Sequence, residues 1–157
     1  MKLATHVAFS SSIAAALALL AGCPASCAWY AAWSSALVNI ALDLLGHEVR
    51  GGRPRRTAFS HSFVGPLAFS TVFMTSALLA PPPEALAAII AILVGSYSHL
   101  ALDAVTEGGV YPYWPLSSKR WRLASLPYNH PTANKLAMLM GALALLTSLL
   151  VRGLPSL

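Results

Sequence analysis

Residues 85–103 read ALAAIIAILVGSYSHLALD, and this stretch decides the fold. It is an apolar run whose only histidine and only acid, His99 and Asp103, come at its end. About 20 predominantly apolar residues are needed for a helix to cross the hydrocarbon core of a bilayer. The run therefore predicts a transmembrane helix over about 85–102 that ends in an imidazole and a carboxylate.

Four other apolar stretches accompany this one. We expect them to form spans at about 7–22, 28–45, 62–80 and 136–151. The first and last are short for a bilayer. Turn-forming residues separate the stretches, and the two longest breaks are the loops 46–61 and 107–135. The sequence thus predicts one all-α domain over 1–157, a polytopic membrane bundle of four to five transmembrane helices.

The composition supports a membrane protein. Of 157 residues, 57% are hydrophobic and only 10% are charged, whereas a soluble domain has about 25% charged residues. Too little polar surface is available to cover a soluble fold of this size. Membrane lipid is therefore the expected partner of most of the outer surface.

The net charge of +5 is concentrated in the two long loops. The clusters are Arg50, Arg53, Arg55 and Arg56 in one loop, and Lys119, Arg120 and Arg122 in the other. Basic loops between apolar spans normally stay in the cytoplasm and can hold anionic lipid headgroups, so no nucleic-acid partner is expected. This rule predicts a multi-pass protein of the inner (plasma) membrane whose amino terminus and basic loops are cytoplasmic.

The predicted topology brings most ionisable groups of the spans to the cytoplasmic face. These candidate metal ligands are His6, Asp43, His47, His61, His99 and Asp103. Two pairs, Asp43 with His47 and His99 with Asp103, are spaced by four residues and share a helical face. Imidazole and carboxylate ligands suit zinc, manganese or iron(II), and we expect zinc.

Other interpretations of the same residues stay open at this point. His47 and His61 are also compatible with ordinary interfacial positions, and Asp43 with an ion pair to an arginine of the following loop. His99 and Asp103 end an apolar run and must face the bundle interior, where ionisable residues are functional by default. His130 is interpreted as a loop residue outside the site.

The amino-terminal stretch also resembles a bacterial lipoprotein signal peptide. Lys2 is followed by an apolar run and by Leu20-Ala21-Gly22-Cys23. Cleavage before Cys23 would remove His6 from the mature protein. Cys23 and Cys27 are compatible with a disulfide or with two inert thiols.

Several motifs resemble a known family. The order Thr5-His6, Asp43 with His47, RTAFSHS over 56–62 and SHLALDAVTEGGV over 98–110, followed by YWPLS over 113–117, is similar to the membrane-bound metal-dependent hydrolases, the YdjM-like proteins and their archaeal relatives. That family is distantly similar to zinc-dependent phospholipase C in its His and Asp pattern. The resemblance implies the ligands His6, Asp43, His61, His99 and Asp103.

The chain departs from the family pattern at one motif. Many relatives carry Pro-Asp-x-Asp-His, whereas this chain has LDLLGH over 42–47. One acid is missing, and whether His47 replaces it is open. The difference bears on a second metal ion more than on the first.

The sequence therefore favours a metal-dependent hydrolase that acts on a phosphoester or lipid-like substrate at the cytoplasmic face. Glu107 or Asp43 would accept a proton from the attacking water. The phosphate would be held by Arg50, Arg53, Arg55 and Arg56. The alternative is an integral membrane protein that binds a metal without catalysis.

Overall fold

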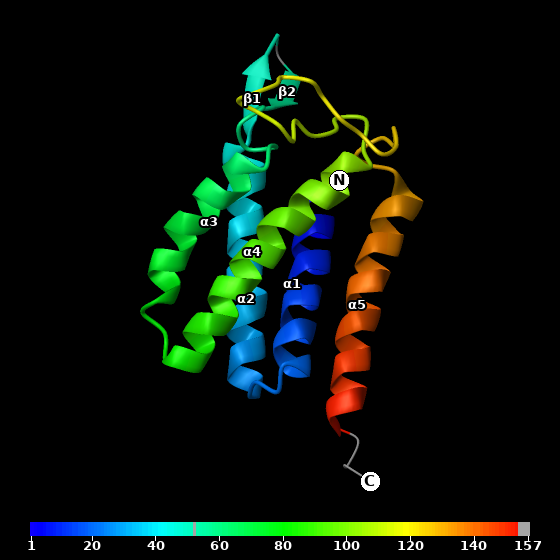
Figure 1. Ribbon diagram of the computed structural model, residues 1–157. Helices are drawn as coiled ribbons and strands as arrows, with labels where there is room; N and C mark the ends of the chain where they lie inside the picture. The colour runs from blue at the N-terminus through cyan, green and yellow to red at the C-terminus, as the bar shows by residue number, and fades with distance from the viewer. Residues whose placement is uncertain (52, 154–157) are drawn as a thin grey trace.

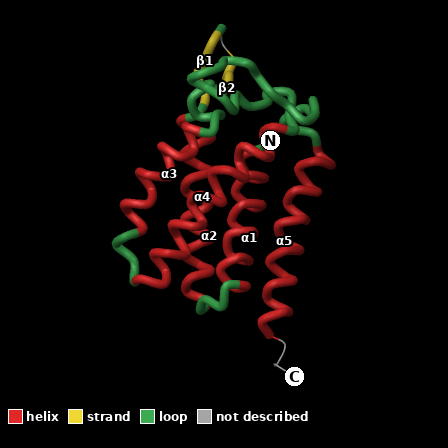
Figure 2. The backbone as a smooth tube through the Cα atoms, in the orientation of Figure 1, coloured by secondary structure: helices red, strands yellow, loops and turns green. Residues whose placement is uncertain are grey.

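The computed structural model describes residues 1–51 and 53–153, which form five helices and one two-stranded hairpin (Figures 1 and 2). The helices are α1 (Leu3–Leu20), α2 (Ala25–Leu45), α3 (Val64–Ala77), α4 (Pro82–Ala104) and α5 (Pro131–Gly153). The hairpin strands are β1 (His47–Arg50) and β2 (Arg53–Arg56), which lie between α2 and α3. The predicted all-α membrane bundle is confirmed.

Three helices are long and apolar enough to cross a membrane, namely α1, α4 and α5. Helix α2 has 21 residues and lies beside α1 and α4 (Figure 1), so it shares their layer. Helix α3 has only 14 residues, a rise of about 21 Å, which is shorter than a hydrocarbon core of about 30 Å. It is therefore a shorter helix than the span expected over 62–80.

The helix boundaries differ from the predicted ones for local reasons. Helix α5 begins at Pro131, five residues before the expected start, and proline suits the first helical position. Just before it, the Nδ1 atom of His130 accepts a hydrogen bond from the backbone N–H of Ala133 at 3.2 Å. His130 thus satisfies a free donor of the first turn, and the long loop ends at residue 130.

Small residues allow the helices to approach closely. The core contacts of α1, α2 and α4 are largely alanine against alanine, at Ala14, Ala18, Ala31, Ala87 and Ala91. At Gly95 of α4, a Cβ atom would lie 2.7 Å from Ser35 Oγ and 3.0 Å from Val38 Cγ1 of α2. Without a hydrophobic driving force in lipid, such close packing is what holds membrane helices together.

Polar contacts attach α5 to the rest of the bundle. The Thr5 hydroxyl of α1 donates a hydrogen bond to the Asn134 side chain of α5 at 2.5 Å, and the backbone N–H of Lys2 donates to the same oxygen. Most of the remaining surface of α5 is exposed and apolar. It forms the lipid-facing outer layer beside α1 (Figure 1).

The two ends of the bundle differ. The amino terminus, the β1–β2 hairpin and the long loop after α4 lie together at one end, which we call the hairpin end (Figure 1). The loop folds back on itself through bridges from Thr106 to Leu126 and from Val110 to Trp121. At the opposite end, the Arg152 guanidinium donates hydrogen bonds to the carbonyls of Gly22 and Cys23.

The hairpin was not expected, because the sequence indicated only a loop over 46–61. Gly51 adopts φ +59° at the turn between the strands, a conformation that glycine reaches without steric cost. Two glycines between short segments are a known hairpin signal. The many arginines, which are poor strand formers, obscured it.

We expect Gly95→Val to destabilise the bundle because the added methyl groups would collide with Ser35 and Val38. Overpacking of this kind costs about 1–3 kcal/mol. Thermal unfolding of detergent-purified protein, followed by circular dichroism, measures the effect. The control is Ala101→Val, which places the same side chain at an exposed position of the same helix. Equal midpoints for the two variants would contradict close packing at Gly95.

Candidate metal centre

Four segments meet at the hairpin end and place their ionisable side chains together. His6 comes from α1, Asp43 from the last turn of α2, His61 from the turn after β2, and His99 and Asp103 from α4. All except Asp43 are at most 1% exposed. The side chains therefore lie inside the bundle, as expected for ionisable residues in membrane helices that serve a function.

The Asp103 carboxylate lies at the centre of this group. Its Oδ1 atom is 3.1 Å from Nε2 of His6. Its Oδ2 atom is 3.2 Å from Nε2 of His61 and 3.4 Å from Nε2 of His99. Three imidazoles thus direct the same ring atom at one carboxylate.

These atoms are close but not hydrogen-bonded. Among the described residues, the Nε2 atoms of His6, His61 and His99 and the Oδ2 atom of Asp103 are buried without a hydrogen-bond partner. An unsatisfied buried polar group costs about 1–3 kcal/mol. Four such atoms facing one another form an arrangement that a cation would satisfy.

The spacing of the atoms fits a metal ion. Zinc binds imidazole nitrogen at about 2.0–2.1 Å, so two ligand atoms of a tetrahedral ion lie about 3.3 Å apart. The separations of the His61 and His99 nitrogens from Asp103 Oδ2, 3.2 and 3.4 Å, match that value. Buried His and Asp groups that are able to bind a metal ion are therefore present.

Two overlapping trios have donor atoms within 4.8 Å of one another. One comprises His61, His99 and Asp103, and the other comprises His6, Asp43 and His99. Because His99 belongs to both trios, and an imidazole nitrogen has one lone pair, His99 can serve only one ion through Nε2. The geometry favours a single ion among these five side chains.

Asn39 orients His99, a role that the sequence analysis missed. Its amide nitrogen donates hydrogen bonds to the carbonyls of Ser35 and Gly95 at 2.8 and 3.2 Å. These bonds turn the amide oxygen toward Nδ1 of His99, 3.2 Å away. An amide oxygen only accepts, so Nδ1 carries the proton and Nε2 keeps its lone pair for a metal. A polar residue four positions before Asp43, within an apolar span, was the available signal.

His61 is oriented in the same way by its neighbour. The Ser60 hydroxyl donates to the Gly46 carbonyl at 3.0 Å and lies 2.8 Å from Nδ1 of His61, so it accepts the ring proton. Burial lowers the pKa of His61 below its ordinary value of 6.5, and the opposing effect of the Asp103 carboxylate is smaller. A neutral imidazole with a free Nε2 is the form that binds metals.

His47 lies beside the centre but not in it. Its Nδ1 atom is 2.6 Å from the Asp43 carbonyl, and its ring is edge-on to His61 with the ring centroids 5.4 Å apart. It is not a member of either trio among the described residues. The structure therefore does not bring His47 into the group of converging donor atoms.

Arg56 contacts the centre directly. Its guanidinium donates to Oδ1 of Asp103 at 2.5 Å and to the Thr106 hydroxyl and the Gly109 carbonyl at 2.9 and 3.0 Å. The Met1 amino group also donates to Oδ1, at 2.6 Å. Because its donors are used in this way, Arg56 differs from the free phosphate-binding arginine that the sequence suggested.

A cavity of about 980 Å³ opens beside the centre and contains most of the other predicted residues. Asp43, His47, Arg55, Arg56 and Glu107 line it, together with Lys2 and Arg120, which the sequence analysis did not assign to a site. The side chains of Arg50 and Arg53 lie outside the part of the chain that the structure describes. The described lining thus combines four basic side chains with the carboxylates of Asp43, Glu48 and Glu107.

We expect Asn39→Leu to weaken zinc binding about 10- to 100-fold, the usual cost of losing the partner that orients a ligand. Competition with a chromogenic chelator measures the dissociation constant. Ser35→Ala is the matched control, since Ser35 is buried one turn away and its hydroxyl has no hydrogen-bond partner. An unchanged constant in folded Asn39→Leu protein would contradict the orienting role.

Comparison with known proteins identifies the family. Residues 1–154 match the YdjM inner membrane protein family. No curated protein and no solved structure matches the chain. The match covers nearly the whole chain, including all four segments of the His and Asp cluster. The chain belongs to the YdjM inner membrane protein family.

Proposed function

We propose that this protein is a metal-dependent hydrolase of the inner membrane that cleaves a phosphoester. The observation that carries the proposal is the set of unpaired His6, His61 and His99 nitrogens around the Asp103 carboxylate, next to a cavity whose lining includes basic side chains. A bound zinc ion would lower the pKa of its water to about 7 and would itself polarise the phosphoryl oxygen. The family's similarity to zinc-dependent phospholipase C supports this reaction class.

Residues of the chain would hold the metal ion, accept the proton and bind the phosphate. His6, Asp43, His61, His99 and Asp103 would hold the ion. Because Asp43 is grouped with the ligands, we assign proton acceptance to Glu107. Glu107 is exposed and lines the same cavity. Lys2, Arg55 and Arg120 line it too and would bind the phosphate, and Arg56 would position Asp103.

A metal site that only stabilises the fold is the second candidate. Ligands from α1, α4 and the turn after β2 would join distant segments of the chain. A structural zinc is closed by four protein ligands, whereas a catalytic zinc keeps a position for water. Cobalt-substituted protein distinguishes the two, because only the catalytic arrangement shows an exchangeable water in its spectrum.

The packing of α1 supports a retained amino terminus rather than lipoprotein processing at Cys23. Helix α1 contacts α2, α4 and α5 and supplies His6 to the centre. Its removal would expose alanine contacts in the core and leave α5 without its Thr5 contact. Uptake of labelled lipid at Cys23 would contradict this proposal.

We expect His61→Ala to lose its zinc, from about one ion per chain to a trace, because His61 supplies one of the three imidazoles that surround the Asp103 carboxylate. Metal analysis of detergent-purified protein measures this, and hydrolysis of a chromogenic phosphoester should fall to the rate of chelator-treated protein. His61 lies in a turn, so the bundle should remain folded. His130→Ala is the control, a histidine at the same end outside the cluster. Full zinc content in His61→Ala would overturn the ligand assignment.

We also propose that the hairpin end faces the cytoplasm. Lys2, Arg55, Lys119, Arg120 and Arg122 are exposed there, whereas Glu84 and Arg152 are the charged residues of the opposite end within the described chain. Basic segments stay on the cytoplasmic side.

Cysteine labelling tests this orientation. In protein with Cys23 and Cys27 replaced by alanine, we expect Ser118→Cys to react with an impermeant maleimide only after cells are permeabilised. Pro83→Cys, exposed at the opposite end, should react in intact cells. The reverse pattern would refute the proposed orientation.

A further inference from the structure

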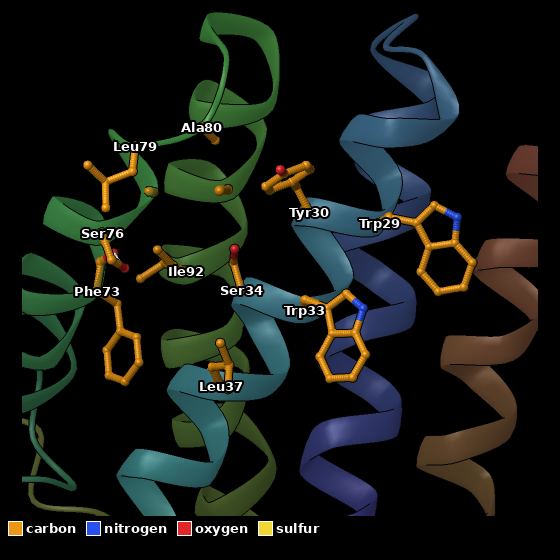
Figure 3. Close-up of a pocket in the computed structure, with 12 residues that line it drawn as sticks. Trp29, Tyr30, Trp33, Ser34, Leu37, Phe73, Ser76, Leu79, Ala80 and Ile92 are labelled. Atoms are coloured by element: carbon orange, nitrogen blue, oxygen red, sulfur yellow. Dashed lines mark hydrogen bonds between the residues drawn. The ribbon is translucent and has the colours of Figure 1, made fainter.

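A second cavity lies away from the hairpin end, between α2, α3 and α4 (Figure 3). Its volume is about 450 Å³, within the range of pockets that hold small molecules. Its larger lining side chains include Trp29, Tyr30, Trp33, Leu37, Phe73 and Ile92. None of the described residues that line it is charged. We call it the apolar cavity.

Side chains from two helices face each other across this cavity. In Figure 3, Phe73 of α3 and Leu79 of the turn after α3 lie opposite Ser34 and Leu37 of α2. This hollow is bordered by α2, α3 and α4, and it is open to its surroundings, since Trp33, Leu37 and Leu79 are 63%, 49% and 90% exposed. The apolar cavity is therefore suited to hold one hydrocarbon chain in a fixed place.

An exposed apolar stripe on α2 joins this cavity to the metal centre. Trp33, Leu37 and Leu44 follow one another at helical spacing and are 63%, 49% and 67% exposed. Leu37 lines the apolar cavity, while Leu44 lines the cavity beside the metal centre. They are two helical turns apart on the same face, a distance of about 10.5 Å. This face of α2 is thus an apolar path with one cavity at each end.

The length of the path suits a membrane lipid chain. One chain spans about half of the ~30 Å hydrocarbon core, or ~15 Å, which is the rise of ten helical residues. Ten residues separate Asp43, beside the metal centre, from Trp33 in the apolar cavity. At the polar end, Lys2, Arg55 and Arg120 would attract an anionic head. The basic side chains beside the metal centre and the apolar face of α2 therefore match an anionic amphiphile.

We propose that the apolar cavity is a subsite for the hydrocarbon chain of the substrate, whose phosphate lies at the metal centre. The inference rests on the proposed function and adds the substrate class, a phosphoester of a long-chain alcohol or lipid. Short water-soluble phosphoesters would lack the contacts with Leu37 and Trp33. The apolar cavity then favours substrates that carry a long hydrocarbon chain.

A photoreactive probe tests the subsite without requiring hydrolysis. The probe is a hexadecyl phosphonate, which cannot be hydrolysed, with a diazirine at the end of its chain. It is added to zinc-loaded, full-length protein in lipid nanodiscs, and labelled peptides are mapped by mass spectrometry. We expect the label on residues 29–37 and 73–80. An excess of unlabelled hexadecyl phosphonate should suppress it.

Two variants provide matched changes in side-chain volume. Ser34→Phe fills the apolar cavity and should reduce this labelling roughly tenfold, as expected for the loss of about two methylene contacts. Ala142→Phe adds the same ring to an exposed position of α5 and should leave it unchanged. Leu37→Ala shortens an exposed side chain that lines the apolar cavity. The variant protein should therefore fold normally, and its labelling should also fall.

The possible outcomes are distinct. Label spread over α5 as heavily as over α2, or unaffected by Ser34→Phe, would overturn the subsite and indicate ordinary surrounding lipid. Labelling of α2 and α3 by the phosphonate, in a protein that hydrolyses no phosphoester, would support the chain subsite while refuting the proposed reaction. Loss of labelling on removal of zinc would connect the two cavities.

Discussion

The Asp103 carboxylate is buried among helices that otherwise pack alanine against alanine, and a charge in such a place is costly unless it is neutralised. Much of the hairpin end meets this requirement. The β2 strand delivers Arg56 and the amino terminus delivers the Met1 amino group, and both donate to Oδ1 of the carboxylate. The long loop after α4 contributes the Thr106 hydroxyl and the Gly109 carbonyl that hold Arg56 in place. Contacts of the hairpin and of the long loop thus centre on the Asp103 carboxylate.

The sequence predicted the helical bundle well, because apolar length alone distinguishes membrane helices from loops. It also brought His6, His61, His99 and Asp103 to one end, since alternating spans and basic loops leave few arrangements. It did not predict the hairpin, whose strands are stabilised by contacts rather than by strand-forming residues. Asn39 was missed for a different reason. Its role depends on the carbonyls of Ser35 and Gly95, which only the packing of α2 on α4 brings together.

The arginines show that the charge of a residue in the sequence does not determine what its side chain contacts. Arg55 and Arg56 are adjacent and equally basic, yet strand alternation sends them to different places. Arg56 turns inward to Asp103, while Arg55 is exposed and lines the cavity. One residue supports the centre and the other is available to a ligand. Membership in the YdjM inner membrane protein family places the chain in the membrane. The different contacts of the two neighbouring arginines, by contrast, are set by the fold.

The candidate ligands come from segments that are far apart along the chain, the first in α1 and the last in α4. Contacts between distant segments form late, because long loops must close first. The centre can therefore be completed only after four helices have been inserted, and a metal ion that binds there would stabilise the folded protein by mass action. Metal supply would then govern how long the assembled bundle survives in the cell as well as whether it is active. In a cell short of the metal, a larger fraction of the protein would be incompletely folded. That fraction would be more open to membrane proteases.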